Sequence, residues 1–250
     1  NENRIPINQE TFLMSNMIPQ APDQNQGPWA NRENDRRTIV SAGNEMYIVM
    51  GGHGVGGTGS NGYAETIANG KVTVPNVTWR VILILPTGED DLSRVTCGAR
   101  TIAVIMPNSN TYNGSTIRDD DWHNFIVSVD QVEALTGYDF FANLPDAVEN
   151  CIEAGVNGTN PPGTANQSAS TTEDTAVTIT LQAVRSNNNN LTFSVVGSGP
   201  THGTLGPISA ASCTNGECVA TVTYTPGPHY NGADSFAFKV NDGNFDSNVA

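Results

Sequence analysis

The sequence predicts two domains, an α+β domain followed by an all-β sandwich. The first part combines uninterrupted apolar runs, typical of strands buried on both faces, with segments whose caps and spacing indicate helices. After residue 172, short alternating strands are separated by turn residues. Residues 155–172 are small and polar with a proline pair, a composition typical of a linker. In a chain of 250 residues, we therefore expect domains at 1–154 and 173–250.

The segment 11–37 carries most of the candidate chemistry. Residues 11–17 are predicted to form a short strand, and the prolines that follow exclude a regular element before the next helix. Pro28 suits the first position of that helix, because its missing N–H costs nothing there. The helix should run to about Ala42, with Gly43 as its stop.

Three polar side chains of this segment are candidate site residues. Glu33 and Arg37 are four residues apart on the predicted helix and therefore share one face. Asn25 lies in the turn that enters the helix. An amide, a carboxylate and a guanidinium can thus converge on one small site.

The strings SNMIPQ and NQGPW, followed by Glu33 and an arginine four residues later, resemble the non-specific DNA/RNA endonucleases of the ββα-metal (His-Me finger) group. The resemblance implies that Asn25 is the direct protein ligand of Mg²⁺, with waters completing the shell and Mn²⁺ as an alternative ion. It also implies that Glu33 and Arg37 orient this shell and stabilise the phosphate, and that Asn16 supports the site. A hard ion that keeps several waters suits such a ligand set.

The general base of this family is a histidine in an Asp-Arg-Gly-His motif, which would fall before residue 1. The four histidines of the chain lie downstream and outside that motif; they are His53, His123, His202 and His229. We therefore interpret the sequence as beginning inside the nuclease domain, and we expect this fragment to be inactive without the upstream histidine.

Further strands are predicted at 45–50, 71–75, 78–85 and 100–106. In the family, strands of this kind form a central antiparallel sheet flanked by helices, and WRVILIL and AVIMPN resemble them. A capping box of Ser128 and Gln131 predicts another helix, closed by Gly137. The string LTGYDFF resembles the family's C-terminal signature, which extends the similarity to about Cys151.

Two patterns are interpreted as surface loops. Gly52, Gly54 and Gly57 match a dinucleotide-binding pattern after a strand, but no helix or βαβ unit is predicted to follow, so a loop with a solvated His53 is the better interpretation. The acidic triplet at 119–121 could bind a cation, yet three adjacent carboxylates seldom all face one ion.

The four cysteines favour disulfides. Cys213 and Cys218 flank a turn sequence and should pair across a hairpin, which leaves Cys97 and Cys151 to close a long loop in the first domain. A zinc site is the rival interpretation, but no Cys-x-x-Cys or nearby histidine pair supports it.

The strands after residue 172 resemble Ig-like or cadherin-like repeats of large secreted bacterial proteins, through YTPGPHYNGADSFAFKVNDG in particular. That resemblance implies further repeat modules in the full-length protein, with the last strand of this one cut at residue 250. Glu173, Asp174 and Asp242 could bind Ca²⁺ as carboxylates do in cadherin-like modules.

The net charge of −14 argues against tight coating of nucleic acid, for which a basic surface is expected. It permits transient binding in which Arg32, Arg36 and Arg37 form a local positive patch. By resemblance, we expect an Mg²⁺-dependent endonuclease with DNA and RNA as substrates, bound through phosphates. The alternative is a non-catalytic structural or adhesive protein that retains a nuclease-like fold.

The composition suits an exported protein, so an extracellular, periplasmic or cell-surface location is expected. The longest apolar run, Val81 to Pro86, is far shorter than the roughly 20 residues that cross a bilayer. No membrane-spanning segment is therefore predicted.

Overall fold

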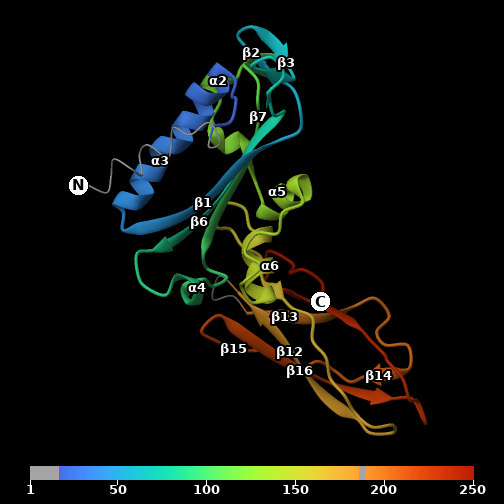
Figure 1. The fold of residues 1–250 in the computed structure, drawn as a ribbon. Helices are drawn as coiled ribbons and strands as arrows, with labels where there is room; N and C mark the ends of the chain where they lie inside the picture. Colours follow the sequence, from blue (N-terminus) through green and yellow to red (C-terminus); the bar gives the residue numbers. More distant parts are fainter. Residues whose placement is uncertain (1–16, 186–189) are drawn as a thin grey trace. The chain divides into compact units, whose positions relative to one another are not determined.

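The computed structural model describes residues 17–185 and 190–250 (Figure 1). The chain divides into two compact units, which are residues 1–82 with 103–127 and residues 83–102 with 128–250. The expected strand at 11–17 lies, except for Met17, outside the described residues, and so does Asn16. No helix in the described part of the chain is long and apolar enough to cross a membrane.

The first unit opens with three consecutive helical segments, α2 (Pro22–Gln24), η2 (Asn25–Trp29) and α3 (Ala30–Ser41). They lead directly into strand β1 (Asn44–His53), beside which α3 lies in Figure 1. Gly43 has φ +85°, a left-handed conformation that a glycine adopts without steric cost. The predicted helix stop is therefore confirmed.

A four-stranded sheet has the order β1-β6-β7-β10, with β6 at Val77–Pro86, β7 at Arg100–Pro107 and β10 at Ile126–Val127. Strand β10 pairs antiparallel with β7. Every residue of β6 between its two ends is buried. The prediction of a strand covered on both faces is confirmed, because an uninterrupted apolar run leaves no face for solvent.

The glycine-rich segment differs from the expected loop. Strand β1 continues through His53, which is exposed, and a hairpin of β2 (Gly57–Gly59) and β3 (Gly62–Ala64) follows. No helix comes after the Gly-x-Gly-x-x-Gly pattern, so the dinucleotide interpretation is rejected.

The strand predicted at 71–75 forms only at β5 (Val72–Thr73), which pairs with β4 (Thr66–Ile67). The other short elements of this unit are β8 (Thr111–Tyr112), β9 (Ser115–Thr116), η3 (Ile117–Asp119) and η4 (Trp122–Phe125). Within the acidic triplet, Asp121 caps η4 by accepting a hydrogen bond from the backbone N–H of His123.

Three helices belong to the second unit: α4 (Asp91–Arg94), α5 (Val129–Thr136) and α6 (Asp146–Ala154). The predicted capping box opens α5, and its glycine stop has φ +73°. Both predictions are confirmed. The predicted Cys97–Cys151 disulfide is present and fastens α6 to the segment before β7. The cluster of buried apolar residues around them is Leu83, Leu85, Val95, Ala99, Leu144 and Ile152.

The segment expected as a linker is packed in its first part. The buried Asn160 donates to the carbonyls of Cys97 and Ala99 at 2.7 and 2.8 Å. Strand β11 (Gly163–Thr164) then pairs with β12 (Val177–Val184). Composition could not predict this packing, because it does not show that the Asn160 amide binds two backbone carbonyls 63 and 61 residues earlier in the sequence. Residues 166–176 are exposed.

The C-terminal module is an all-β sandwich of two sheets. One sheet has the order β11-β12-β16-β14, with β15 also paired to β16, and the other pairs β13 with β17. The remaining strands are β13 (Thr192–Val196), β14 (Gly203–Leu205), β15 (Ser212–Thr214), β16 (Glu217–Pro226) and β17 (Ala237–Asn241). Both sheets supply the core, which includes Leu181 and Val222 from one and Phe193, Phe238 and Val240 from the other.

The predicted hairpin disulfide is also present. Cys213 and Cys218 are directly opposite each other on β15 and β16, and they are bonded. Asn215 and Gly216 between them both have positive φ, the turn that matches the twist of two-residue hairpins.

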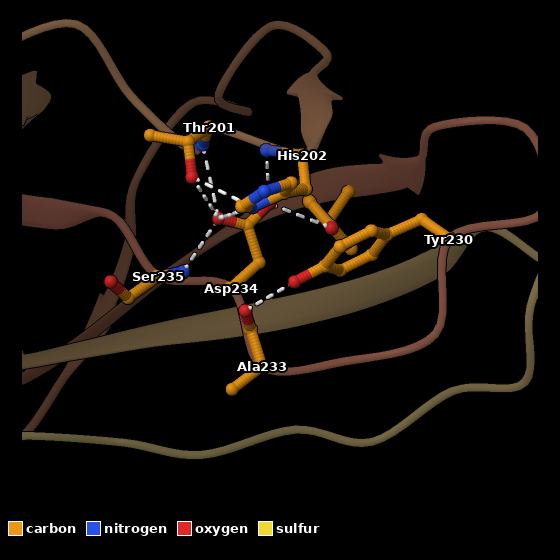
Figure 2. A network of polar contacts seen from close by, with 7 residues as sticks. Thr201, His202, Tyr230, Ala233, Asp234 and Ser235 are labelled. Atoms are coloured by element: carbon orange, nitrogen blue, oxygen red, sulfur yellow. Dashed lines mark hydrogen bonds and ion pairs between the residues drawn. The ribbon is translucent and has the colours of Figure 1, made fainter.

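Asp234 is the centre of a polar network that holds two loops of this module together (Figure 2). Partial burial opposes its ionisation, but the hydrogen bonds it accepts outweigh that effect and lower the pKa of Asp234 to about 2. Its donors include the backbone N–H groups of Thr201, His202 and Ser235 and the hydroxyls of Thr201 and Tyr224. The carboxylate therefore stays ionised and serves as a structural anchor.

Candidate active site

The candidate site lies on a bent helical segment. At Gly27, φ −96° and ψ −111° interrupt the helical conformation between η2 and α3. A Cβ at this position would lie only 2.4 Å from the carbonyl oxygen of Arg118, so glycine is required where η3 passes close to the bend. The predicted helix from Pro28 is thus regular only from Ala30, and Asn25 lies on the other side of the bend from Glu33.

Asn25 is exposed at the start of η2, and its backbone N–H donates to the carbonyl of Ala21 at 2.9 Å. Its neighbours are held by Arg118, whose guanidinium binds Asp23 Oδ1 at 2.9 Å and Gln26 Oε1 at 2.6 Å. Within the described residues, the Asn25 side chain makes no hydrogen bond, so its amide oxygen is available to a ligand.

Glu33 is held between two arginines. Its Oε1 lies 2.8 Å from Arg36 Nη2 and 3.3 Å from Arg80 Nη2. The Glu33 side chain is 48% exposed, whereas that of Arg80 is completely buried. The carboxylate is therefore held by a buried guanidinium on one side and is accessible to solvent on the other.

Arg80 is a residue of the candidate site that was not predicted from the sequence. It lies in the middle of β6, and its Cζ is 3.9 Å from the centroid of the Trp29 ring, a cation–π contact. Burial, with a smaller effect of Arg36, lowers the pKa of Arg80 to about 10, and Glu33 opposes the decrease. The guanidinium is still protonated near neutral pH. The sequence signal for this residue was an arginine inside an otherwise apolar strand, because a buried charge needs a partner.

A second buried cation orients α3. Arg32 is fully buried, with its Cζ 4.7 Å from the centroid of the Trp122 ring, and Trp122 Nε1 donates to Asp35 Oδ2 at 2.6 Å. The predicted surface patch of three arginines is therefore wrong for Arg32, because it packs under the helix. Arg36 and Arg37 remain at the surface, half-buried and exposed respectively.

Arg37 lies one turn after Glu33 on the regular part of α3, so the two residues share a face, as predicted from their spacing. Among the described residues, the Arg37 guanidinium forms no ion pair. Within that part of the chain, its positive charge is not paired with a carboxylate and lies one helical turn from Glu33, an arrangement suited to an anionic ligand.

The other candidates are not joined to this site. The described residues include no histidine in contact with Glu33, and His123 instead stacks on Trp122 with ring centroids 3.8 Å apart. In the C-terminal module, Asp242 accepts from the backbone of Asn244 and Phe245, while Asp174 lies against His229. The expected Ca²⁺ ligands there do not form one cluster among the described residues.

Comparison with known proteins finds two family matches along the chain. The model of the DNA/RNA non-specific endonuclease family matches residues 5–147, and that of the bacterial Ig domain matches residues 159–250. A protein named Nuclease from Nostoc sp. is 41% identical over 149 residues, which are 60% of this chain and 49% of that protein.

Two more distant relatives match the same part of the chain. A Nuclease from Serratia marcescens is 28% identical over 146 residues, 56% of this chain and 47% of that protein. Mitochondrial endonuclease G of Bos taurus is 24% identical over 139 residues, 54% of this chain and 42% of that protein. The chain therefore spans about half the length of the curated relatives it matches.

Proposed function

The chain belongs to the DNA/RNA non-specific endonuclease family. We propose that it is part of a metal-dependent endonuclease that hydrolyses phosphodiester bonds of both DNA and RNA. The observation that carries this proposal is the anchored Glu33, placed between a buried arginine and a surface arginine and one turn from the exposed Arg37. A site of this kind presents one ordered carboxylate and one exposed cation to a ligand.

The residues fit a hard divalent ion. Asn25 offers an exposed amide oxygen, and Glu33 offers a carboxylate that is half exposed. Mg²⁺ takes few protein oxygens and keeps several waters, so one amide ligand with a carboxylate near its water shell suits it, and Mn²⁺ has similar preferences. When bound, such an ion acts as a Lewis acid toward a phosphoryl oxygen.

The protein's own side chains orient water and neutralise charge on the phosphate. Glu33 accepts hydrogen bonds from water in the orientation that Arg80 and Arg36 impose on it. Arg37 pairs with a non-bridging phosphate oxygen as negative charge develops there. The base that takes the proton from the attacking water is proposed to be the histidine of the family's Asp-Arg-Gly-His motif.

Broad substrate choice follows from phosphate recognition. Contacts to phosphate and sugar position a nucleic acid without reading its sequence. The net charge of −14 means that binding depends on local cations such as Arg36 and Arg37 together with the metal. We infer weak, salt-sensitive binding of substrate, in keeping with a nuclease that releases its products.

The test is cleavage of supercoiled plasmid and of structured RNA by the full-length protein, with Mg²⁺ or with EDTA. Both substrates should be cut with Mg²⁺, and neither with EDTA. The chain of 250 residues, assayed beside the full-length protein, should be inactive if the base lies outside it. A full-length protein that cuts neither substrate would favour a structural or adhesive role instead.

Arg80 should act as a positioning residue for Glu33. We expect Arg80→Met to lower the cleavage rate about tenfold, or roughly 1.4 kcal/mol, and to raise the Mg²⁺ concentration needed for half-maximal rate. Methionine fills the space beside Trp29 without the desolvation cost of a charge, so the melting temperature should change little.

Arg100→Met is the matched control for this variant, because Arg100 is exposed and binds only the Asn157 side chain among its described contacts. An unchanged Mg²⁺ dependence in Arg80→Met would refute the positioning role, even if the rate fell.

The C-terminal module and the disulfides support a proposal about location. Two disulfides require an oxidising compartment, and the second domain belongs to a bacterial Ig type. We therefore propose a secreted or cell-surface nuclease, with the Ig domain as a spacer or attachment module.

A further inference from the structure

A group of five carboxylates in the second unit takes no part in the proposed reaction. It consists of Asp130 and Glu133 from α5, Asp139 from the loop that follows, and Glu149 and Glu153 from α6. Ligand oxygens of Asp130, Glu133 and Glu153 lie within 4.8 Å of one another, and so do those of Asp139, Glu149 and Glu153. Glu153 belongs to both sets and is the centre of the group.

Glu153 is the unusual member. Its side chain is only 5% exposed, and its Oε1 has no hydrogen-bond partner among the described residues. Glu149 Oε1 is likewise buried and without a partner there. An unpaired buried carboxylate oxygen costs several kcal/mol unless something satisfies it.

No positive side chain in the described part of the chain does so. None of the ion pairs there includes any of the five carboxylates. Burial first, then the charges of Glu133 and Glu149, raise the pKa of Glu153 to about 9. A side-chain hydrogen bond with Glu133 and the charge of Asp130 add to the increase, so the charged groups that act on Glu153 are all acidic.

The backbone around the group is firmly held. The capping box of Ser128 and Gln131 starts α5, and the backbone N–H of Phe140 donates to Glu133 Oε1 at 2.7 Å. Cys151, midway between Glu149 and Glu153, is tied by its disulfide to Cys97. The backbone that carries these carboxylates is therefore held by the capping box and the disulfide, with Glu133 itself adding the contact to Phe140.

We propose that this acidic cluster binds a calcium ion, with Glu153 as its central ligand and Glu133, Glu149, Asp130 and Asp139 as the surrounding oxygen donors. Ca²⁺ takes six to eight oxygens in flexible geometry and accepts both mono- and bidentate carboxylates, whereas Mg²⁺ demands a nearly ideal octahedron and keeps most of its waters. The exposed Asp130 and Asp139 give the ion a path from solvent. The ion joins α5 to α6 and supports the fold, so this proposal is independent of the cleavage mechanism.

The test uses thermal unfolding of the complete chain, stripped of metal with EDTA and then titrated with CaCl₂ at pH 7.5. The melting temperature should rise by about 5 °C at a hundredfold excess over the dissociation constant, because an ion that binds only the folded state stabilises it by mass action. Mg²⁺ at the same concentration should give a clearly smaller shift.

Variants locate the site. Glu153→Gln should abolish the Ca²⁺ shift, and the exposed Asp139→Asn, which does not threaten folding, should weaken the Ca²⁺ affinity about tenfold. The matched control is Glu89→Gln, an exposed glutamate outside the cluster. The shift should persist in Asn25→Ala, which separates this site from the proposed Mg²⁺ site.

Two outcomes would overturn the proposal. One is a Ca²⁺ shift that Glu153→Gln and Asp139→Asn leave intact, which would place the ion elsewhere. The other is a melting temperature that does not change with Ca²⁺ but falls as the pH rises from about 4.5 toward 9. That result would mean that Glu153 is protonated in the folded protein and binds no ion.

Discussion

Asn25→Ala should lower Mg²⁺-dependent cleavage by the full-length protein about a thousandfold, equivalent to roughly 4 kcal/mol of transition-state stabilisation. Asn25 is the only residue of the site that we assign as a direct metal ligand, and its exposed side chain supports no part of the core. The loss should therefore appear in activity while the fold is intact. Initial rates of plasmid nicking over a range of Mg²⁺ concentrations, with circular dichroism of the same samples, measure both.

Asn31→Ala is the matched control, because Asn31 is an exposed asparagine on α3 beyond the bend. Its rate should stay near that of the unaltered protein. Near-normal cleavage by Asn25→Ala would refute the assignment of the metal ligand.

Glu33→Gln gives a second comparison. The amide keeps the shape of the side chain but loses the charge that Arg80 and Arg36 hold in place, so the rate should fall by less than in Asn25→Ala. An equal or greater loss would mean that Glu33 contacts the metal directly.

The second large effect concerns stability. Replacing Cys97 and Cys151 together by alanine should lower the free energy of unfolding of residues 1–154 by about 4 kcal/mol, because the bond closes a loop with a sequence separation of 54 and removes that freedom from the unfolded chain. The pair also fastens α6, which carries Glu149 and Glu153. Loss of the bond should therefore weaken Ca²⁺ binding at the acidic cluster as well.

The hairpin disulfide is the internal comparison. Its sequence separation is 5, so the same relation gives only about 2 kcal/mol for the double alanine variant of Cys213 and Cys218. Urea unfolding followed by tryptophan fluorescence reports on residues 1–154, which hold all three tryptophans, and far-UV circular dichroism reports on the strands of the C-terminal module. A larger loss of stability in the module of the hairpin variant than in residues 1–154 of Cys97→Ala/Cys151→Ala would contradict the loop-length argument.

Local chemistry was readable without the structure. The capping box at Ser128, the stop at Gly43, the alternating strands of the Ig domain and the Cys213–Cys218 hairpin all follow from rules that involve neighbouring residues. Even the shared face of Glu33 and Arg37 needs only a helical repeat. In each of these, a side chain and its partner are separated by only a few residues.

The folded arrangement decided what lies around those local features. Arg80 reaches Glu33 from 47 residues away, and the approach of Arg118 to Gly27 bends the helix that was expected to begin at Pro28. The buried Arg32 looked from its spacing like a surface cation. Such contacts depend on how strands and helices pack, and a sequence pattern does not show which distant segments pack against each other.

The same distinction applies to the acidic cluster around Glu153. The sequence alone predicted the helix α5 from its capping box, and it singled out none of the five carboxylates. Only the tertiary structure turned Glu153 inward and placed Glu133 beside it. The physical reason is that burial is a property of the whole fold, and burial is what makes an ordinary carboxylate require a partner.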